Sequence, residues 1–89
     1  MQTRVLTIIN EEGLHLRPAQ VLANAAGQFA ADIYVEVAGG GEANAKSVLG
    51  IIALGLEKGA EVKLSADGED EEQAVARLAE LFEQGFGEQ

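Results

Sequence analysis

The stretch LRPAQVLANAAGQF, residues 16–29, decides the fold, because its apolar side chains gather on one side of a helix. They recur at spacings of three and four residues, the period of an amphipathic helix. The apolar positions are Ala19, Leu22, Ala23, Ala26 and Phe29. Gln20, Asn24 and Gln28 fall on the opposite side. A helix with one apolar face must cover another layer of structure, so we expect a sheet elsewhere in the chain.

Four segments have the patterns of β-strands. Residues 3–9, TRVLTII, are β-branched and aliphatic, and the polar NEEG that follows closes this strand. Residues 32–38, DIYVEVA, alternate apolar and polar side chains. The three glycines at 39–41 predict a tight hairpin turn into the short strand EANA. Residues 59–68, GAEVKLSADG, contain the last strand.

A short second helix is expected over residues 48–54, VLGIIAL. Ser47 stands directly before it, and serine is a favoured N-cap because its hydroxyl accepts from a backbone N–H of the first turn. Helical spacing makes Ile51 and Leu54 candidates for the core and leaves Val48, Leu49 and Ile52 as candidates for an exposed surface.

A third helix is predicted over residues 69–85, EDEEQAVARLAELFEQG. Asp70 and Gln73 have the spacing of a capping box, and Gly85 is a natural end for the helix. Its buried stripe is predicted to be Ala74, Val75, Leu78, Leu81 and Phe82.

The predicted elements follow in the order β-α-β-β-α-β-α, within a single domain that spans residues 1–89. Three helices with one apolar face each need a sheet to cover. We therefore predict an α+β fold, a two-layer sandwich of four mostly antiparallel strands with the helices on one face and water on the other.

Composition excludes several classes of protein. Without cysteine, neither a disulfide framework nor a thiolate site can form, and one histidine with no nearby carboxylate cluster argues against a metal site. No apolar run approaches the length of a membrane helix, and no signal peptide is expected. The net charge of −9 argues against nucleic-acid binding. We expect a soluble, cytoplasmic monomer without a cofactor.

The carboxylates are unevenly distributed along the chain. Residues 13–31 contain none, and Arg17 is the only permanent charge there. Residues 43–56 also contain none, and Lys46 is their only charge. Ten of the fifteen acidic residues follow later in the chain. Two segments of a strongly negative protein are therefore free of negative charge, either because their helices are buried or because their exposed sides form a functional surface.

The only histidine lies where a helix begins. Gly13 allows a sharp turn, and His15 is predicted at or near the N-cap, with Leu16, Arg17 and Pro18 in the first turn. Proline is tolerated there because its missing N–H has no intrahelical partner. Free N–H groups and the helix dipole suit an anion, and the Arg17 fork fits phosphoryl oxygens. A neutral imidazole could accept a phosphoryl group here, although a lone histidine in a loop is more often a solvated surface residue.

Two motifs resemble the signatures of one family. GLHLRPA, residues 13–19, is similar to the active-site signature of HPr, the histidine-containing phosphocarrier of the bacterial sugar phosphotransferase system. NAKSVLGIIALGLEKGAEV, residues 44–62, resembles its second signature, which contains a serine that opens a short helix. The resemblance covers nearly the whole chain and implies an open-faced β-sandwich.

The resemblance also implies a role for each matched residue. His15 would accept a phosphoryl group on Nδ1 from enzyme I and pass it to an enzyme IIA component of a sugar permease, while Arg17 steadies the phosphate and Pro18 shapes the helix start. Ser47 matches the serine that HPr kinase/phosphorylase modifies with ATP. The expected partner-binding residues are Leu16, Gln20, Val48, Leu49 and Ile52.

Departures from the family pattern leave the partner open. Leu16 stands where small residues or threonine are commoner, and Asn24 and Gly50 stand where enteric carriers often have lysines. The ending LFEQGFGEQ is similar to carriers of the nitrogen branch or of dihydroxyacetone kinase systems. A second hypothesis is a mainly regulatory module in which phosphorylated Ser47 docks to a transcriptional regulator. A small-molecule-binding domain is supported by architecture alone.

Overall fold

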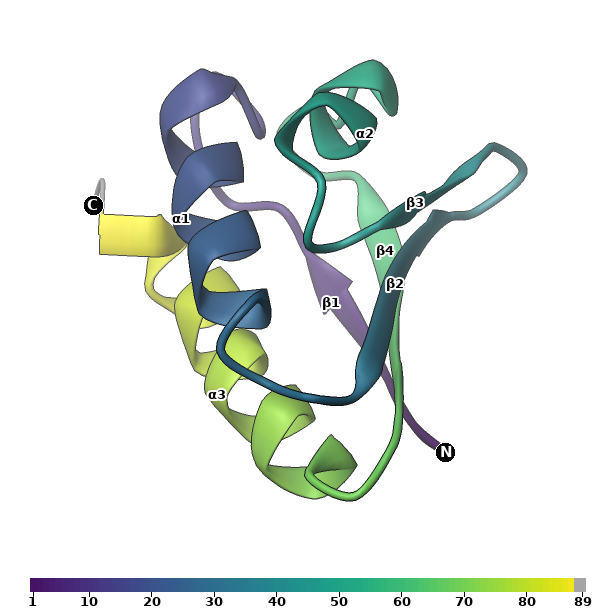
Figure 1. Ribbon diagram of the computed structural model, residues 1–89. Coiled ribbons are helices and arrows are strands. Elements are labelled where there is room, and N and C mark those ends of the chain that lie inside the picture. The colour runs from purple at the N-terminus through teal and green to yellow at the C-terminus, as the bar shows by residue number, and fades with distance from the viewer. Residues whose placement is uncertain (88–89) are drawn as a thin grey trace.

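The computed structural model describes residues 1–87 and contains four strands, three α-helices and one short 3₁₀ turn in this part of the chain (Figure 1). In chain order these are β1 (Gln2–Thr7), α1 (Leu16–Ala26), β2 (Asp32–Val37), β3 (Glu42–Asn44), α2 (Val48–Ala53), β4 (Glu61–Asp67), α3 (Glu71–Glu83) and η1 (Gly85–Gly87). The predicted order of elements is confirmed. No helix among these residues is long and apolar enough to span a bilayer.

The four strands form one antiparallel sheet in the order β1-β4-β2-β3. The helices cover only one face of it, so the predicted α+β architecture is confirmed (Figure 1). The alternation along β2 shows the two faces, because Ile33 and Val35 are buried under the helices while Tyr34 and Glu36 are exposed. The other face of the sheet is open to solvent.

The core lies between the sheet and the apolar stripes of the helices. Leu22 of α1, Ile51 of α2, and Leu78 and Phe82 of α3 are almost completely buried. The predicted stripes of α1 and α3 are confirmed, except that Phe29 lies beyond the end of α1 and is only partly buried.

The predicted capping box of α3 is wrong. Asp70 does precede α3, but its side chain makes no capping hydrogen bond, and its backbone (φ −102°, ψ 25°) differs from the extended conformation of a usual N-cap. Its carboxylate instead accepts hydrogen bonds from the N–H groups of Ala30 (2.8 Å) and Ala31 (2.9 Å) in the loop after α1. Asp70 thus joins α3 to the α1–β2 connection.

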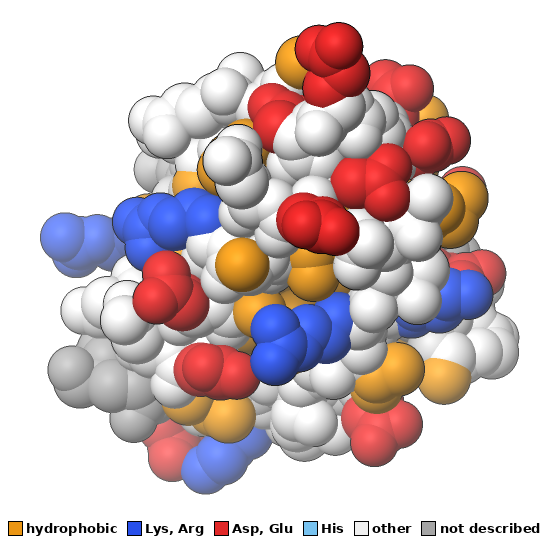
Figure 2. Space-filling view, turned by 90° about the horizontal axis from the view of Figure 1, so that it is seen from below, with side chains coloured by type: hydrophobic (Ala, Val, Ile, Leu, Met, Phe, Trp, Pro, Cys, Tyr) orange, Lys and Arg blue, Asp and Glu red, His pale blue; other side chains and the backbone are white. Residues whose placement is uncertain are grey.

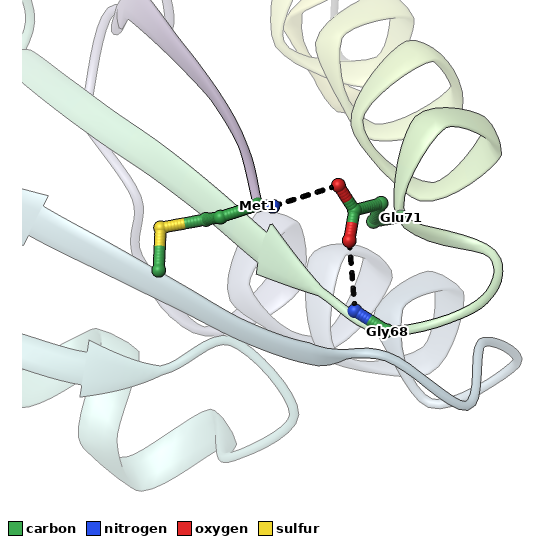
Figure 3. Close-up of polar contacts among 3 residues, drawn as sticks. All are labelled: Met1, Gly68 and Glu71. Atoms are coloured by element: carbon green, nitrogen blue, oxygen red, sulfur yellow. Dashed lines mark hydrogen bonds and ion pairs between the residues drawn. The ribbon is translucent and has the colours of Figure 1, made fainter.

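The next residue supplies the contact that holds the start of α3. The Glu71 carboxylate accepts from the Gly68 N–H at 3.1 Å and forms an ion pair with the amino group of Met1 at 3.0 Å (Figure 3). These contacts hold the pKa of Glu71 below its ordinary value, chiefly through the Gly68 hydrogen bond. The beginning of β1 is therefore fastened to the loop between β4 and α3.

The α1–β2 loop is held from a second side by Lys46, which precedes α2. Its Nζ donates to the Phe29 carbonyl oxygen at 2.8 Å. The Ala30 and Ala31 amides, together with the charge of Lys46, hold the pKa of Asp70 below its ordinary value of 3.8, and the Ala30 hydrogen bond is the largest cause. One loop thus receives contacts from residues before both later helices.

We predict that Asp70→Asn lowers the melting temperature at neutral pH. The Ala30 and Ala31 N–H groups now donate to the two oxygens of a charged carboxylate, and asparagine offers a single neutral carbonyl oxygen. The pKa of Asp70 is lowered on folding, so its stabilisation is present above about pH 4 and is lost as the pH falls through the folded-state value. The difference between wild type and variant should therefore shrink below about pH 4 in thermal unfolding followed by circular dichroism. Glu72→Gln, an equal charge change at an exposed position of α3, is the control. A difference that is the same from neutral to strongly acidic pH would contradict this account.

Candidate functional site

His15 is the N-cap of α1, as predicted. Its backbone is extended (φ −78°, ψ −168°), and its carbonyl oxygen accepts the first helical hydrogen bond, from Ala19 N–H at 3.0 Å. The His15 side chain is half-buried and makes no capping hydrogen bond to the helix. The imidazole therefore lies at the helix start but does not occupy the position at which an anion would accept from the first amides of α1.

The first turn of α1 has the features of an anion site. The N–H groups of Leu16 and Arg17 have no acceptor within the helix, because the first residues of any helix lack one. The Leu16 and Arg17 side chains are exposed, and Pro18 is buried at the third helical position, where no donor is lost. Amides without an acceptor inside the helix, the positive end of the dipole and an exposed guanidinium lie within one turn of the histidine.

The turn before His15 depends on a glycine. The Gly13 N–H donates to the Asn10 carbonyl oxygen at 3.0 Å, and the next residue, Leu14, donates to the Leu56 carbonyl oxygen at 3.0 Å. A Cβ at Gly13 would lie 2.1 Å from that same Leu56 oxygen, and the φ of +70° is one that side chains disfavour. Only glycine allows this close approach, which fixes the path of the backbone into the histidine.

One carboxylate of this turn, that of Glu11, is paired with a lysine. The Lys58 Nζ lies 2.6 Å from an oxygen of Glu11, and this contact lowers the pKa of the Glu11 carboxyl. Both side chains are exposed. Lys58 therefore compensates the charge of Glu11, and the first turn of α1 that follows carries no carboxylate of its own.

The second predicted segment lies beside the first. Helix α2 contacts α1, and Figure 1 shows it at the end of the molecule where α1 begins. Ser47 is its N-cap, as predicted, with Oγ accepting from the Gly50 N–H at 3.0 Å. The serine is exposed. The structure therefore brings both motifs to one end of the fold.

Exposed apolar side chains surround this end. Leu49 is 80% exposed, Leu16 56% and Ile52 37%, and we call these three residues the apolar patch. Of the other residues expected to meet partners, Gln20 is exposed on α1, while Val48 is half-buried and packs against the core. Helical spacing on α2 was predicted correctly, since Ile51 is buried and Leu54 packs partly into the core.

The opposite end of the molecule has a different charge. Figure 2 views that end from below and shows acidic side chains gathered over part of it, with lysine and arginine side chains among them. Glu69 and Glu72, near the start of α3, belong to the exposed acids of the chain. The two carboxylate-free segments, by contrast, form the first helix and the second, so the helix that begins at His15 carries no carboxylate itself.

One residue of the site region was missed by the sequence reasoning. Asn10, taken as part of a polar end to the first strand, is only 1% exposed. The alternation of Leu6, Ile8 and Asn10, each two residues apart and each buried, would have placed it on the inner face. No group of acidic, histidine or cysteine side chains suited to a metal ion occurs within residues 1–87.

The whole chain is similar to known proteins of one family. Residues 2–84 match the family described as the PTS HPr component phosphorylation site. The crystal structure of HPr from Thermoanaerobacter tengcongensis superposes with a TM-score of 0.94 at 44% identity, covering 100% of this chain and 99% of that one. The phosphocarrier protein HPr from Bacillus anthracis gives 0.85 at 32% identity, with 91% and 95% covered.

A third similar structure bears on regulation and assembly. Crh, the catabolite repression protein of Bacillus subtilis, is 34% identical with a TM-score of 0.75, covering 96% of this chain and 97% of that one. It is described as a dimer with a swapped domain. The monomeric state expected from the sequence therefore stays a prediction.

Proposed function

Because the chain belongs to the HPr family of phosphocarriers, we propose that it relays phosphoryl groups in the cytoplasmic part of a sugar phosphotransferase system. His15 accepts the group from phosphorylated enzyme I and passes it to an enzyme IIA domain. In each step one P–N bond breaks and another forms, from donor histidine to His15 and then from His15 to the acceptor histidine. The observation that carries this proposal is the place of His15 at the N-cap of α1, two residues before Arg17.

The residues around His15 supply alignment and charge compensation, the two main requirements of phosphoryl transfer. Backbone N–H groups of the first turn are directed at the position of the incoming phosphoryl oxygens. Arg17 provides a charged donor fork for the same oxygens. Pro18 fixes the backbone at the helix start, where its conformation is already helical. The partner protein completes the line of donor, phosphorus and acceptor.

We predict that His15→Ala abolishes labelling of the protein by phosphoenolpyruvate plus enzyme I, because the chain has one histidine. Arg17→Gln should slow labelling on the order of 100-fold, since a preorganised donor to the transferring group is lost. The measurement is transfer of ³²P followed by rapid quench. Asn24→Ala, an exposed change further along α1, serves as the matched control and should react at the wild-type rate. Undiminished labelling of His15→Ala would contradict the proposal.

The apolar patch is proposed as the part of the surface that partners cover. A large apolar side chain as exposed as Leu49 is typical of a docking surface when other exposed apolar side chains accompany it. Ile52 is exposed on the same helix, and Leu16 is exposed at the start of α1, which contacts α2. The segments that carry the patch contain no carboxylates, so an acidic partner such as enzyme I meets no like charge there.

Leu49→Asp is expected to weaken binding to enzyme I by about 10-fold or more, because it removes apolar contact area and adds negative charge at the patch. Titration calorimetry measures the change. Val5→Asp is the control, because Val5 is also an exposed apolar residue (64%) but lies on β1 in the sheet, away from α1 and α2. Equal weakening by the two substitutions would show that net charge, not the patch, governs docking.

A regulatory role for Ser47 is the second candidate function. Its exposed hydroxyl caps α2, and a phosphate on Oγ would face the amides of that helix start, where a dianion is tolerated. The modification would place negative charge next to Leu49 and oppose docking to an acidic partner. The similarity to Crh, a catabolite repression protein, favours this role, in which phosphorylated Ser47 would dock to a transcriptional regulator. The presence of His15 favours the relay instead. A carrier for a nitrogen-branch or dihydroxyacetone kinase system would use the same His15 chemistry.

Incubation with ATP and HPr kinase/phosphorylase is expected to label wild type and His15→Ala equally and to leave Ser47→Ala unlabelled. Phosphorylation on Ser47 should also slow the later transfer from enzyme I to His15, because the added charge lies at the docking surface. Mass spectrometry locates the phosphate, and the rapid-quench assay measures the rate. Label that survives Ser47→Ala would exclude Ser47 as the site.

A further inference from the structure

Asn10 is the one buried polar side chain in the described core. It lies after β1, at the beginning of the turn that leads into His15. Its Nδ2 donates to the carbonyl oxygen of Gly85 at 2.8 Å, a buried contact between residues 75 positions apart in the chain. A buried amide costs free energy unless it is hydrogen-bonded, so the geometry of this contact is strongly enforced.

The same residue closes the turn that presents the histidine. Its carbonyl oxygen accepts the Gly13 N–H at 3.0 Å, while Glu11 and Glu12 between them project into solvent. Gly13 and Leu14 then contact Leu56 on the other side, through the close approach and the hydrogen bond described above. The backbone that enters His15 is therefore held from two sides, by Leu56 directly and by Gly85 through Asn10.

The acceptor at Gly85 is itself well fixed. Gly85 is buried and adopts a φ of +63°, which ends α3 and turns the chain into η1. Phe86 follows with a buried side chain, and its ring packs edge-on against the ring of Phe82 with centroids 4.9 Å apart. Helix α1 contacts η1, so the end of α3 supports the helix that begins at His15.

We propose that Asn10 is a positioning residue for His15: its buried amide fastens the turn before the histidine to the end of α3. The proposal rests on the phosphocarrier function, because it concerns the accuracy with which His15 meets a phosphoryl donor. Loss of the amide frees the Asn10–Gly13 turn to shift, and the imidazole at the helix start shifts with it. A misplacement of a reacting group by about 1 Å is enough to slow transfer by about 100-fold.

Asn10→Leu tests the proposal, because leucine has nearly the same size and lacks the amide. Transfer of phosphoryl from phosphorylated enzyme I should slow by about 10- to 100-fold in a variant that is folded by circular dichroism. Phe86→Leu loosens the turn that carries the Gly85 carbonyl without touching Asn10, and it should slow transfer in the same direction. It also keeps the test decisive if Asn10→Leu does not fold.

Asp70→Asn is the matched control, because it weakens contacts to the loop at the other end of α1 and should destabilise the protein without affecting transfer. NMR gives an independent readout at fixed pH, since the ring signals of the single histidine need no assignment by mutation. The NMR signals of the His15 ring and of the Gly13 and Leu14 amides should shift in Asn10→Leu and Phe86→Leu. The same signals should keep their wild-type chemical shifts in Asp70→Asn.

A folded Asn10→Leu variant with wild-type transfer and an unmoved His15 ring would overturn the proposal. Equal slowing by Asp70→Asn would overturn it as well, because the effect would then follow stability alone. If wild-type protein is not labelled by enzyme I at all, the proposed function fails, and the NMR signals alone decide whether Asn10 positions His15.

Discussion

The close approach of the Gly13 backbone to the Leu56 carbonyl sets the point at which α1 begins, and the functional end of the molecule depends on it. Any side chain at Gly13 would meet the Leu56 oxygen, so the chain can enter the helix by this path only with glycine there. The path places His15 at the N-cap and Arg17 in the first turn. It also joins the first motif to the segment that follows α2, so one contact relates both motifs.

The sheet provides the frame on which this contact is made. The three helices cover one face of the sheet and bury a shared apolar core. The site lies at an end of the helical layer, where it takes up few core residues. Asn10, the one buried polar residue among residues 1–87, is next to the site. Stability and function thus meet at one residue, while most of the core serves packing alone.

Much of this arrangement could be predicted from the sequence because it depends on local patterns. Periodicity placed the strands and helices, and the Gly13–Pro18 segment identified the start of α1. The roles of Asp70 and Asn10 could not be found in this way, since their partners lie 39 to 40 and 75 residues away in the chain. The Asp70 carboxylate could form either a capping box or a tertiary hydrogen bond, and the choice depends on which backbone N–H groups the fold brings near it. The end of α1 was placed too late because Phe29 continues its apolar period. The backbone there forms tighter turns, in which the N–H groups of Gln28 and Phe29 make i to i−3 hydrogen bonds.

The separation of charge has a consequence for how the protein travels between partners. A chain with a net charge of −9 whose two site segments contain no carboxylate carries its negative charge unevenly. In the field of an acidic partner, such a molecule experiences a torque that turns its less negative end forward before contact. Orientation of this kind acts over about 10 Å at physiological salt, so it shortens the search for a productive encounter without adding to the lifetime of the complex. A carrier that must bind, react and dissociate in quick succession benefits, because its association becomes faster while its dissociation is not slowed.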